Sequence, residues 1–288
     1  MKKLLLATSA LIASATIANA QAVTISGEGR MGIMVWDNGV ATAWTQENRL
    51  TLNFNVAIEA DHGLSFGAWT SARTQSSWWG SYTGTFSGSR VWVEASGVRL
   101  TFGNVDGAMA TAGVSHGYLG GCGVGYEGGP ICGDSVGLLT IAHQEVNPGA
   151  GSPSMALVTY TSGDTVVAVS HQRGVSTEIG ARTSFGAFTV AAGYTTLFDV
   201  WTISGHYDGG AWGAGAIVAA NSVATNWALS GNVQVLGGNL YGYVGRVFTA
   251  NAYGLSFGYD LGGGATLTAG AERVGNLTMG SLGVAFTF

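Results

Sequence analysis

Beyond residue 20, the sequence alternates apolar with polar or small side chains in segments of about ten residues. Successive side chains of a β-strand point to opposite faces, so each such segment has one apolar and one polar face. A soluble β-sandwich shows the same alternation but needs charged side chains on its outer surface. Only 9% of the residues are charged, against roughly 25% in a typical soluble domain. The pattern therefore indicates strands whose apolar faces contact lipid.

A membrane protein must satisfy its backbone hydrogen bonds internally, which leaves only helices and closed β-barrels. Beyond residue 20, Gly, Ser, Thr and Asn interrupt every apolar run before it reaches the roughly 20 residues of a spanning helix. The sequence thus predicts an antiparallel transmembrane β-barrel. Its sixteen predicted strands are 22–36, 46–60, 63–76, 87–96, 98–103, 155–162, 164–172, 176–184, 186–195, 198–208, 211–220, 224–235, 238–248, 252–261, 264–274 and 278–288.

Tight-turn motifs follow every second predicted strand. They lie at 61–63, 96–97, 162–164, 184–186, 208–210, 236–238 and 261–264. Gly and Asp supply the positive-φ positions that such turns need. All of these turns fall on one rim, as in outer-membrane barrels, whose periplasmic connections are the short ones.

The first twenty residues have the pattern of a secretory signal peptide. A basic start, Met1 to Lys3, precedes an apolar stretch over 4–17 and a small-x-small cleavage motif ending at Ala20. The alternative, an N-terminal membrane anchor, requires a longer apolar run. We expect residues 1–20 to be removed and residues 21–288 to form the barrel. Both lysines leave with the signal peptide, and the acidic chain that remains argues against nucleic-acid binding.

The sequence resembles the general diffusion porins of alphaproteobacteria over nearly all of residues 21–288. The most specific parts are the opening 25–32, the stretch 253–265 and the terminal 283–288. The resemblance implies sixteen strands, a homotrimer and a long third loop folded into the lumen as a constriction. It also implies that Phe288, at the end of an alternating strand, is read by the barrel assembly machinery. The chain has fewer charges than the family leads us to expect, and its other outer loops are short.

The long connection over 104–154 is predicted to be the constriction loop, because a loop of this length is usually functional or disordered. It contains no Lys or Arg, and its acids are Asp106, Glu127, Asp134 and Glu145. Four arginines have the polar parity of their strands and are predicted to lie around mid-height on one wall: Arg30, Arg49, Arg73 and Arg90. An acidic loop opposite an arginine wall creates a transverse field across a narrow aqueous gap. The alternative is a set of lumenal charges that are paired locally.

Other charged and reactive side chains in the sequence carry weaker signals. Arg99, Glu59 and Glu94 are expected near the turn rim, with Glu28 somewhat higher. The loop holds a G-x-G-x-x-G pattern over 123–128, but no strand precedes it and no helix follows, so we do not interpret it as a nucleotide site. The His and Ser residues of the loop, Ser115, His116 and His143, do not form a recognisable catalytic triad.

Both cysteines lie in the long loop. Cys122 and Cys132 lack the short spacing of a structural zinc site. In an oxidising periplasm they are expected to form a disulfide.

Aromatic side chains are predicted to form lipid-facing girdles near the strand ends. Those assigned to the outward parity are Tyr160, Tyr194, Trp201, Tyr207, Trp212, Trp227, Tyr241, Tyr243, Tyr253, Tyr259, Phe286 and Phe288. About half of this set could instead contact other subunits of a trimer.

The sequence predicts a passive channel for small hydrophilic solutes and ions in the lipid of the outer membrane. Sixteen strands leave a water-filled lumen, whereas about eight would be filled by side chains. We expect no reaction, no cofactor and no metal. A solute-specific channel and a closed structural or adhesive barrel remain as alternatives.

Overall fold

The computed structural model of the chain describes residues 22–77, 80–114 and 155–288. Seventeen strands and two short helices are found in these ranges. The strands are β1 (Ala22–Asp37), β2 (Thr42–Glu59), β3 (Ser65–Ser77), β4 (Gly80–Phe86), β5 (Arg90–Ala95), β6 (Val98–Gly103), β7 (Met155–Ser162), β8 (Thr165–Gln172), β9 (Ser176–Phe185), β10 (Phe188–Thr195), β11 (Val200–Asp208), β12 (Trp212–Ala220), β13 (Thr225–Val235), β14 (Gly238–Val247), β15 (Ala250–Gly262), β16 (Ala265–Val274) and β17 (Leu277–Thr287). The helices are η1 (Asp61–Gly63) and α1 (Ala108–Thr111).

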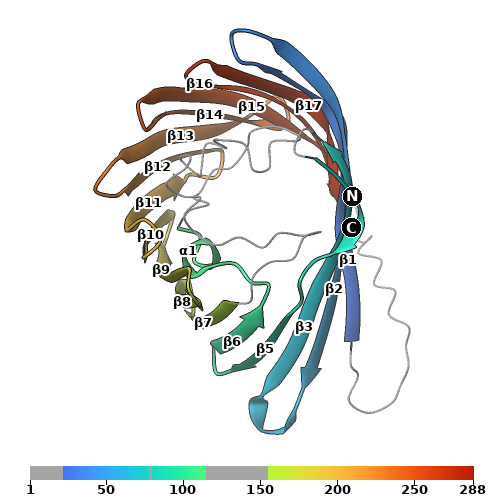
Figure 1. The fold of residues 1–288 in the computed structure, drawn as a ribbon, viewed down its shortest axis with the longest axis vertical. Helices are drawn as coiled ribbons and strands as arrows, with labels where there is room; N and C mark the ends of the chain where they lie inside the picture. The colour runs from blue at the N-terminus through green and yellow to red at the C-terminus, as the bar shows by residue number, and fades with distance from the viewer. Residues whose placement is uncertain (1–21, 78–79, 115–154) are drawn as a thin grey trace, which may run out of the picture.

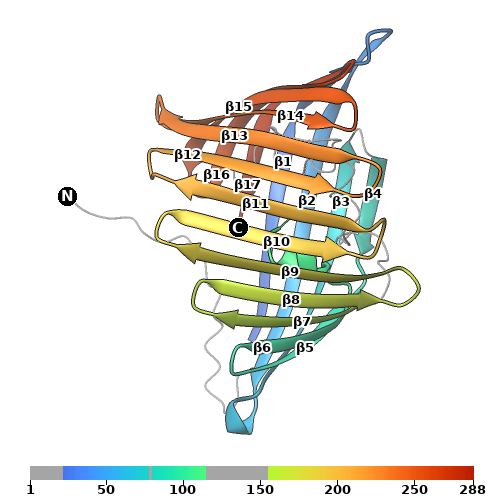
Figure 2. The same ribbon diagram turned by 90° about the vertical axis from the view of Figure 1, so that its left-hand side faces the viewer.

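The strands form one closed antiparallel sheet around a central lumen (Figure 1). Apart from β4 and β5, each strand pairs with its neighbours in the chain, and β1 pairs with both β2 and β17. Strands β4 and β5 both pair with β3, at opposite ends of it, and so share one position in the wall. The result is the predicted sixteen-stranded barrel, whose strands β7 to β15 lie side by side in Figure 2. Neither helix of the described ranges has the length and apolar content needed to cross a membrane.

The fourth wall position differs from the sequence prediction. A single strand over 87–96 was expected, but the structure has β4 and β5 with a break at 87–89. On one side of the break β4 pairs with 72–77 of β3, with a register shift between Arg73 and Gln75, and on the other side β5 pairs with 65–69. Ser87 holds the interrupted segment against β3, since its amide donates to the carbonyl of Ser71 at 2.8 Å. The Gly- and Thr-rich sequence of β4 has little apolar alternation, so periodicity did not reveal it.

The seam of the barrel is the pairing of β1 with β17. Their ladder runs from Glu28 opposite Thr287 to Asp37 opposite Thr278. Gly27 and Phe288 extend it by exchanging two backbone hydrogen bonds of 2.8 and 3.0 Å. The Phe288 ring lies over Gly27, where a Cβ atom would come within 2.7 Å of its Cζ atom. Closure therefore depends on a position without a side chain beside the last aromatic ring.

The predicted tight turns are all present on one rim. Each contains at least one glycine with positive φ. Non-glycine examples are His62, Ser96 and Leu236, with φ of 68°, 51° and 53°. The connections on the opposite rim are also short among the described residues, apart from the one between β6 and β7.

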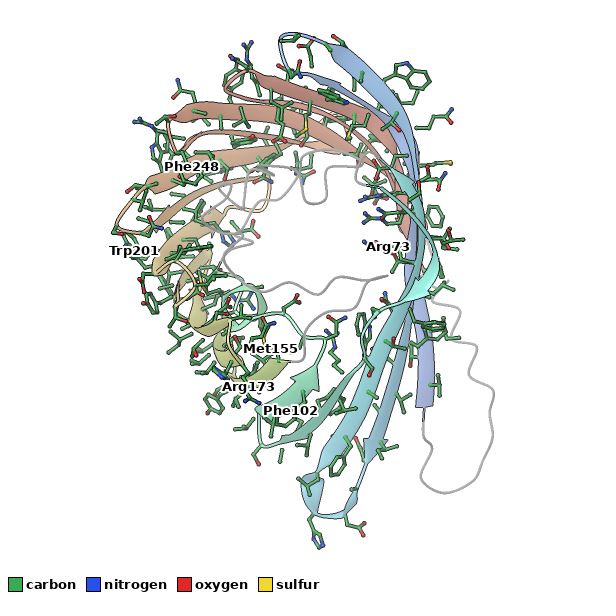
Figure 3. All side chains as sticks on the ribbon, in the orientation of Figure 1. Arg73, Phe102, Met155, Arg173, Trp201 and Phe248 are labelled. Carbon is green, nitrogen blue, oxygen red and sulfur yellow. The ribbon has the colours of Figure 1, made fainter. Side chains whose placement is uncertain are left out.

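The outer face of the barrel is apolar and has aromatic rings at its edges. At the turn rim, Phe185, Phe188, Tyr207 and Trp212 form a continuous chain of ring contacts with centroids 5.0–5.9 Å apart. Aromatic side chains are favoured at this level because one end is apolar and the other is polar. The opposite rim has exposed rings of its own, including Trp201 (Figure 3).

Two tyrosines do not have the predicted outward orientation. Tyr241 and Tyr243 are 2% and 5% exposed and face inward, whereas Val244 is exposed on the outer face. The Tyr243 hydroxyl donates to a carboxylate oxygen of Glu272 at 2.7 Å. Tyr241 and Tyr243 share the parity opposite to that of the exposed Val244 and Arg246, and the hydrogen bond to Glu272 holds the Tyr243 ring inside the wall.

Candidate functional site

Three of the predicted arginines form one cluster on the inner face of β1, β2 and β3. Arg30 and Arg49 are direct partners across β1 and β2. Arg73 on β3 is paired with Thr51, two residues nearer the turn rim than Arg49. Figure 3 shows Arg73 pointing into the lumen. The structure thus brings these three predicted residues together at one level of the wall.

Two glutamates of the same strands hold the cluster. Glu47 is 2% exposed and accepts a charged hydrogen bond of 2.8 Å from Arg30. A Glu28 carboxylate oxygen lies 3.8 Å from Arg49 Nη1 and 3.5 Å from Arg73 Nη2. The three arginines and two glutamates of this cluster leave an excess of positive charge among these five side chains.

Neutral side chains fix the orientation of the guanidinium groups. Arg49 Nε donates to Gln75 Oε1 at 3.0 Å, and Arg73 Nε donates to Thr51 Oγ1 at 3.0 Å. The Thr51 hydroxyl in turn donates to Glu28 at 3.3 Å. Arg49 is itself only 6% exposed. The cluster is therefore a fixed network, whose donors are held in place before any solute arrives.

The fourth predicted arginine lies apart from this cluster. Arg90 on β5 is paired with Trp69 on β3. Trp69 lies four residues nearer the turn rim than Arg73, which is on the same strand. Four residues of strand correspond to roughly 13 Å. The Arg90 guanidinium stacks on the Trp69 ring, with Cζ 4.1 Å from the ring centroid. The sequence predicted one common height for the four arginines, because counting residues from the turn rim does not give the register between strands.

A second arginine and tryptophan pair lies beside Arg90 and Trp69. The Arg99 guanidinium stacks on Trp92, with Cζ 4.3 Å from the ring centroid. Arg99 Nε also donates to Glu94 Oε2 at 2.7 Å. Both charged residues were expected near the turn rim, and their position opposite each other on β5 and β6 agrees with that expectation.

The first residues of the long connection pack against the inner wall. Helix α1 contacts β7, β8, β9 and β10 and lies inside the ring of strands in Figure 1. Its apolar side chains join those of the wall in a buried cluster, made up of Val105, Ala108, Met109, Ala112, Val114, Met155, Leu157, Ala168 and Ala191. Residues 104–114 are therefore seated on one side of the lumen.

Polar groups of the wall fasten this loop base. Glu178 is 1% exposed, and its carboxylate accepts a hydrogen bond of 3.2 Å from the amide of Met109. The Ser170 hydroxyl accepts one of 2.9 Å from the amide of Ala108. A side chain at Gly107 would collide with the Glu178 carboxylate. The base is thus held by two hydrogen bonds from consecutive amides and by close packing.

The predicted acids of the loop fall in two groups. Asp106 lies in the described loop base and lines a cavity together with Arg90, not with the three-arginine cluster. Glu127, Asp134 and Glu145 lie outside the described residues, as do Cys122 and Cys132. The transverse field across the lumen therefore stays a prediction.

Sequence reasoning missed several residues that shape this lumen. Glu47 has the same parity as Arg49, two residues earlier, and that signal was available. Trp69 likewise has the parity of Arg73. Glu178 lies on the polar face of its strand, but only the packing of α1 reveals its partner.

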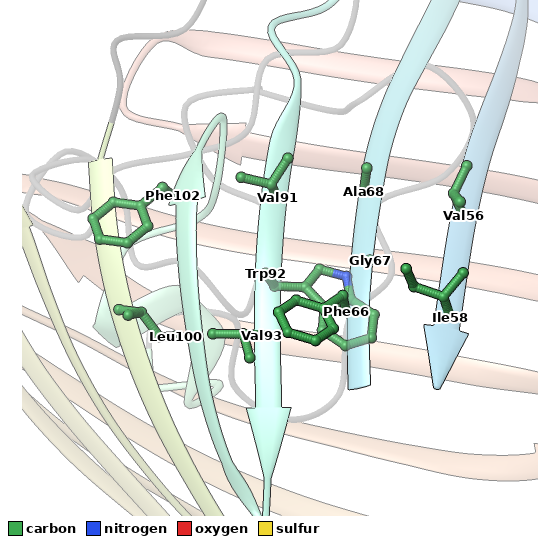
Figure 4. A pocket seen from close by; sticks show the side chains of 10 residues that line it. All are labelled: Val56, Ile58, Phe66, Gly67, Ala68, Val91, Trp92, Val93, Leu100 and Phe102. Carbon is green, nitrogen blue, oxygen red and sulfur yellow. The ribbon is translucent and has the colours of Figure 1, made fainter. Parts of the chain in front are cut away.

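The outer face carries an apolar groove of about 450 Å³ over β2, β3, β5 and β6 (Figure 4). Its lining includes Val56, Phe66, Val91 and Phe102. The groove has few polar groups, so a hydrophilic solute has nothing to bind there. The lumen is the face that can act on polar solutes.

A family model described as Gram-negative porin matches residues 7–278. A search of curated protein sequences finds no match. Among solved structures, two variants of the porin from Rhodopseudomonas blastica give TM-scores of 0.79 and 0.77. Each is 20% identical to this chain, and each alignment covers 93% of this chain and 100% of the other.

Proposed function

Because the chain belongs to the Gram-negative porin family, its barrel is a passive channel of the outer membrane, and we propose that its arginine cluster gives this channel a preference for anions. The observation that carries the proposal is the network that gathers Arg30, Arg49 and Arg73 on the lumenal face, where they pair with Glu28 and Glu47. Rings of charged side chains set the selectivity of many pores. We propose that the channel acts by diffusion alone and catalyses no reaction.

The test is to replace Arg30, Arg49 and Arg73 together with Ala. Purified protein in planar bilayers should then conduct more per channel, because three long side chains leave the lumen. The reversal potential in a KCl gradient should move toward cation preference, since Glu28 and Glu47 remain. The matched control is Arg246→Ala with Arg273→Ala, both exposed and on the outer parity of β14 and β16. An unchanged reversal potential in the lumenal variant would contradict the proposal.

The remaining features of the proposed function rest on the family resemblance and on sequence patterns. We propose that residues 1–20 are a cleaved signal peptide, that three copies assemble, and that Phe288 serves as the assembly signal. Mass spectrometry of the mature N-terminus tests the first. Chemical crosslinking in detergent, followed by denaturing electrophoresis, tests the second. Deletion of Phe288 should lower the amount of folded protein in outer membranes.

We also propose that the rest of the connection, 115–154, narrows the lumen. The described loop base supports this, because α1 is already seated on the inner wall. A solute-specific channel would show saturable flux for one solute class. A closed structural barrel would conduct no ions in a bilayer.

A further inference from the structure

A second polar site lies inside the barrel, on the turn-rim side of the loop base. It is a cavity of about 620 Å³ against the inner face of β2, β3, β5, β6 and β7. Residues of the loop base, among them Asp106 and Thr111, form its opposite side. Small-molecule sites in proteins have volumes of roughly 300–1,000 Å³, so the cavity has room for an organic solute and not only for a simple ion.

Of the two arginines that line this cavity, Arg90 is the one that has no carboxylate or hydrogen-bond partner among the described residues. Within the part of the chain that the structure describes, its guanidinium stacks on Trp69, and over longer distances it is attracted by Asp106 and repelled by Arg99. Among the described residues, no carboxylate lies within 4 Å of it and no group accepts a hydrogen bond from it. Arg99 in the same cavity differs, because Glu94 accepts its hydrogen bond.

The stacking fixes how Arg90 can bind a solute. Trp69 is 9% exposed and holds one flat face of the guanidinium. The N–H donors of a guanidinium lie in its plane, so stacking leaves them available. A carboxylate matches this geometry with two parallel hydrogen bonds. The neighbouring lining supplies the Trp92 ring and the polar groups of Asn55, Thr101 and Thr159.

We propose that this cavity binds small organic carboxylates on their way through the channel, with Arg90 as the group that binds the carboxylate. The proposal rests on the proposed channel function and names a solute class for it. The polar groups and the Trp92 ring then contact the hydroxylated body of the solute. Asp106 opposes the binding by its negative charge. This repulsion weakens the binding, and a channel needs weak binding because a solute that is bound too tightly would not leave.

The experiment is a titration of single-channel current in planar bilayers. Glucuronate is the probe and glucose, a similar sugar without the carboxylate, is its neutral counterpart. With the wild-type protein in KCl, glucuronate should reduce the current in a saturable way, at concentrations at least tenfold below those at which glucose does. Arg90→Gln should raise the half-blocking concentration of glucuronate at least tenfold. Asp106→Asn should lower it severalfold.

Two further variants make the test specific. Arg182→Gln removes a positive charge from the inner face of β9, next to Gly113, where Arg182 is not part of the cavity lining. It should shift the half-blocking concentration less than twofold. Arg90→Lys keeps the charge but loses the forked donors, so it should give an intermediate value. It also provides a result if Arg90→Gln does not fold.

Several outcomes would overturn the inference. Equal shifts in Arg90→Gln and Arg182→Gln would show that general lumenal charge is responsible. If the wild-type protein conducts KCl but glucuronate and glucose reduce its current equally, the carboxylate site is refuted and the channel function is not. A wild-type barrel that conducts no KCl would instead refute the proposed function.

Discussion

Arg30 and Arg49 are direct cross-strand partners on β1 and β2, although both side chains are cationic. Like charges in this position are destabilising unless other groups compensate them. Glu47 lies 2.8 Å from Arg30, and Glu28 lies between Arg49 and Arg73. These carboxylates allow the arginines to share one level of the lumen. The cluster is therefore a partly compensated network with a positive excess and not a simple ring of positive charge.

Replacing Glu47 with Gln should disturb this balance. The variant keeps the volume of the side chain but removes its charge, so anion preference should increase. It should also lower the free energy of unfolding by about 1–3 kcal/mol, because a charged hydrogen bond from Arg30 is weakened. The reversal potential in a KCl gradient and the temperature at which the folded electrophoretic band disappears measure the two effects.

Glu59→Gln is the matched control for Glu47→Gln. Glu59 ends the same strand and is exposed, so both quantities should stay near the wild-type values. If Glu47→Gln behaves like this control, the carboxylate does not balance the cluster.

The fold could be predicted from the sequence because its signals are local. Alternation with period two identifies a strand and its faces, and glycine-rich turns mark where strands end. The prediction was wrong at β4, because its sequence has little apolar alternation and its pairing with β3 contains a register shift. It was wrong for Tyr241 and Tyr243, because an aromatic ring suits either face of the wall and the partner of Tyr243, Glu272, is distant in sequence.

The arginine cluster was predictable in part for a related reason. Parity places Arg30, Arg49, Arg73 and Arg90 on the same face, and the structure has all four inside the lumen. Height along the barrel depends on the register between strands, which the sequence does not specify. Trp69 opposite Arg90 therefore became visible only from the pairing of β3 with β5.

Gly27→Ala should weaken the seam of the barrel. A Cβ atom there would meet the backbone carbonyl of Thr51 on β2, which cannot move aside alone, as well as the Phe288 ring. We expect a loss of about 1–3 kcal/mol from such crowding, seen as a lower Tm of the folded band. Gly205→Ala is the control, since its added atom would find its nearest neighbours at ordinary distances of 3.5 and 3.7 Å. Equal Tm values for the two variants would argue against a strained seam.

Cys122 and Cys132 are predicted to form a disulfide that stiffens the loop without supporting the barrel. The bond would close a ring of eleven residues and contribute about 2–3 kcal/mol by restricting the unfolded chain. Mass spectrometry of the native protein under non-reducing conditions should show the crosslinked peptides. Replacing both with Ser should leave the heat resistance of the folded band intact and increase the noise of the open-channel current. Two free thiols in the native protein would refute the prediction.

Glu178→Ala should loosen the loop base while the barrel stays folded. The buried carboxylate accepts the Met109 amide hydrogen bond and packs against Gly107. Its removal leaves a cavity and an amide without its partner, so α1 should no longer be held firmly on the wall.

We expect larger fluctuations of the open-channel current in Glu178→Ala and faster proteolysis of the loop in detergent. Ser184→Ala is the matched control, because Ser184 lies on the same inner face of β9 but bonds with Thr189 on the neighbouring strand. The control should be as quiet and as protease-resistant as the wild type. If Glu178→Ala matches it in both measurements, then the apolar contacts of Met109 and its neighbours hold the loop base without the carboxylate.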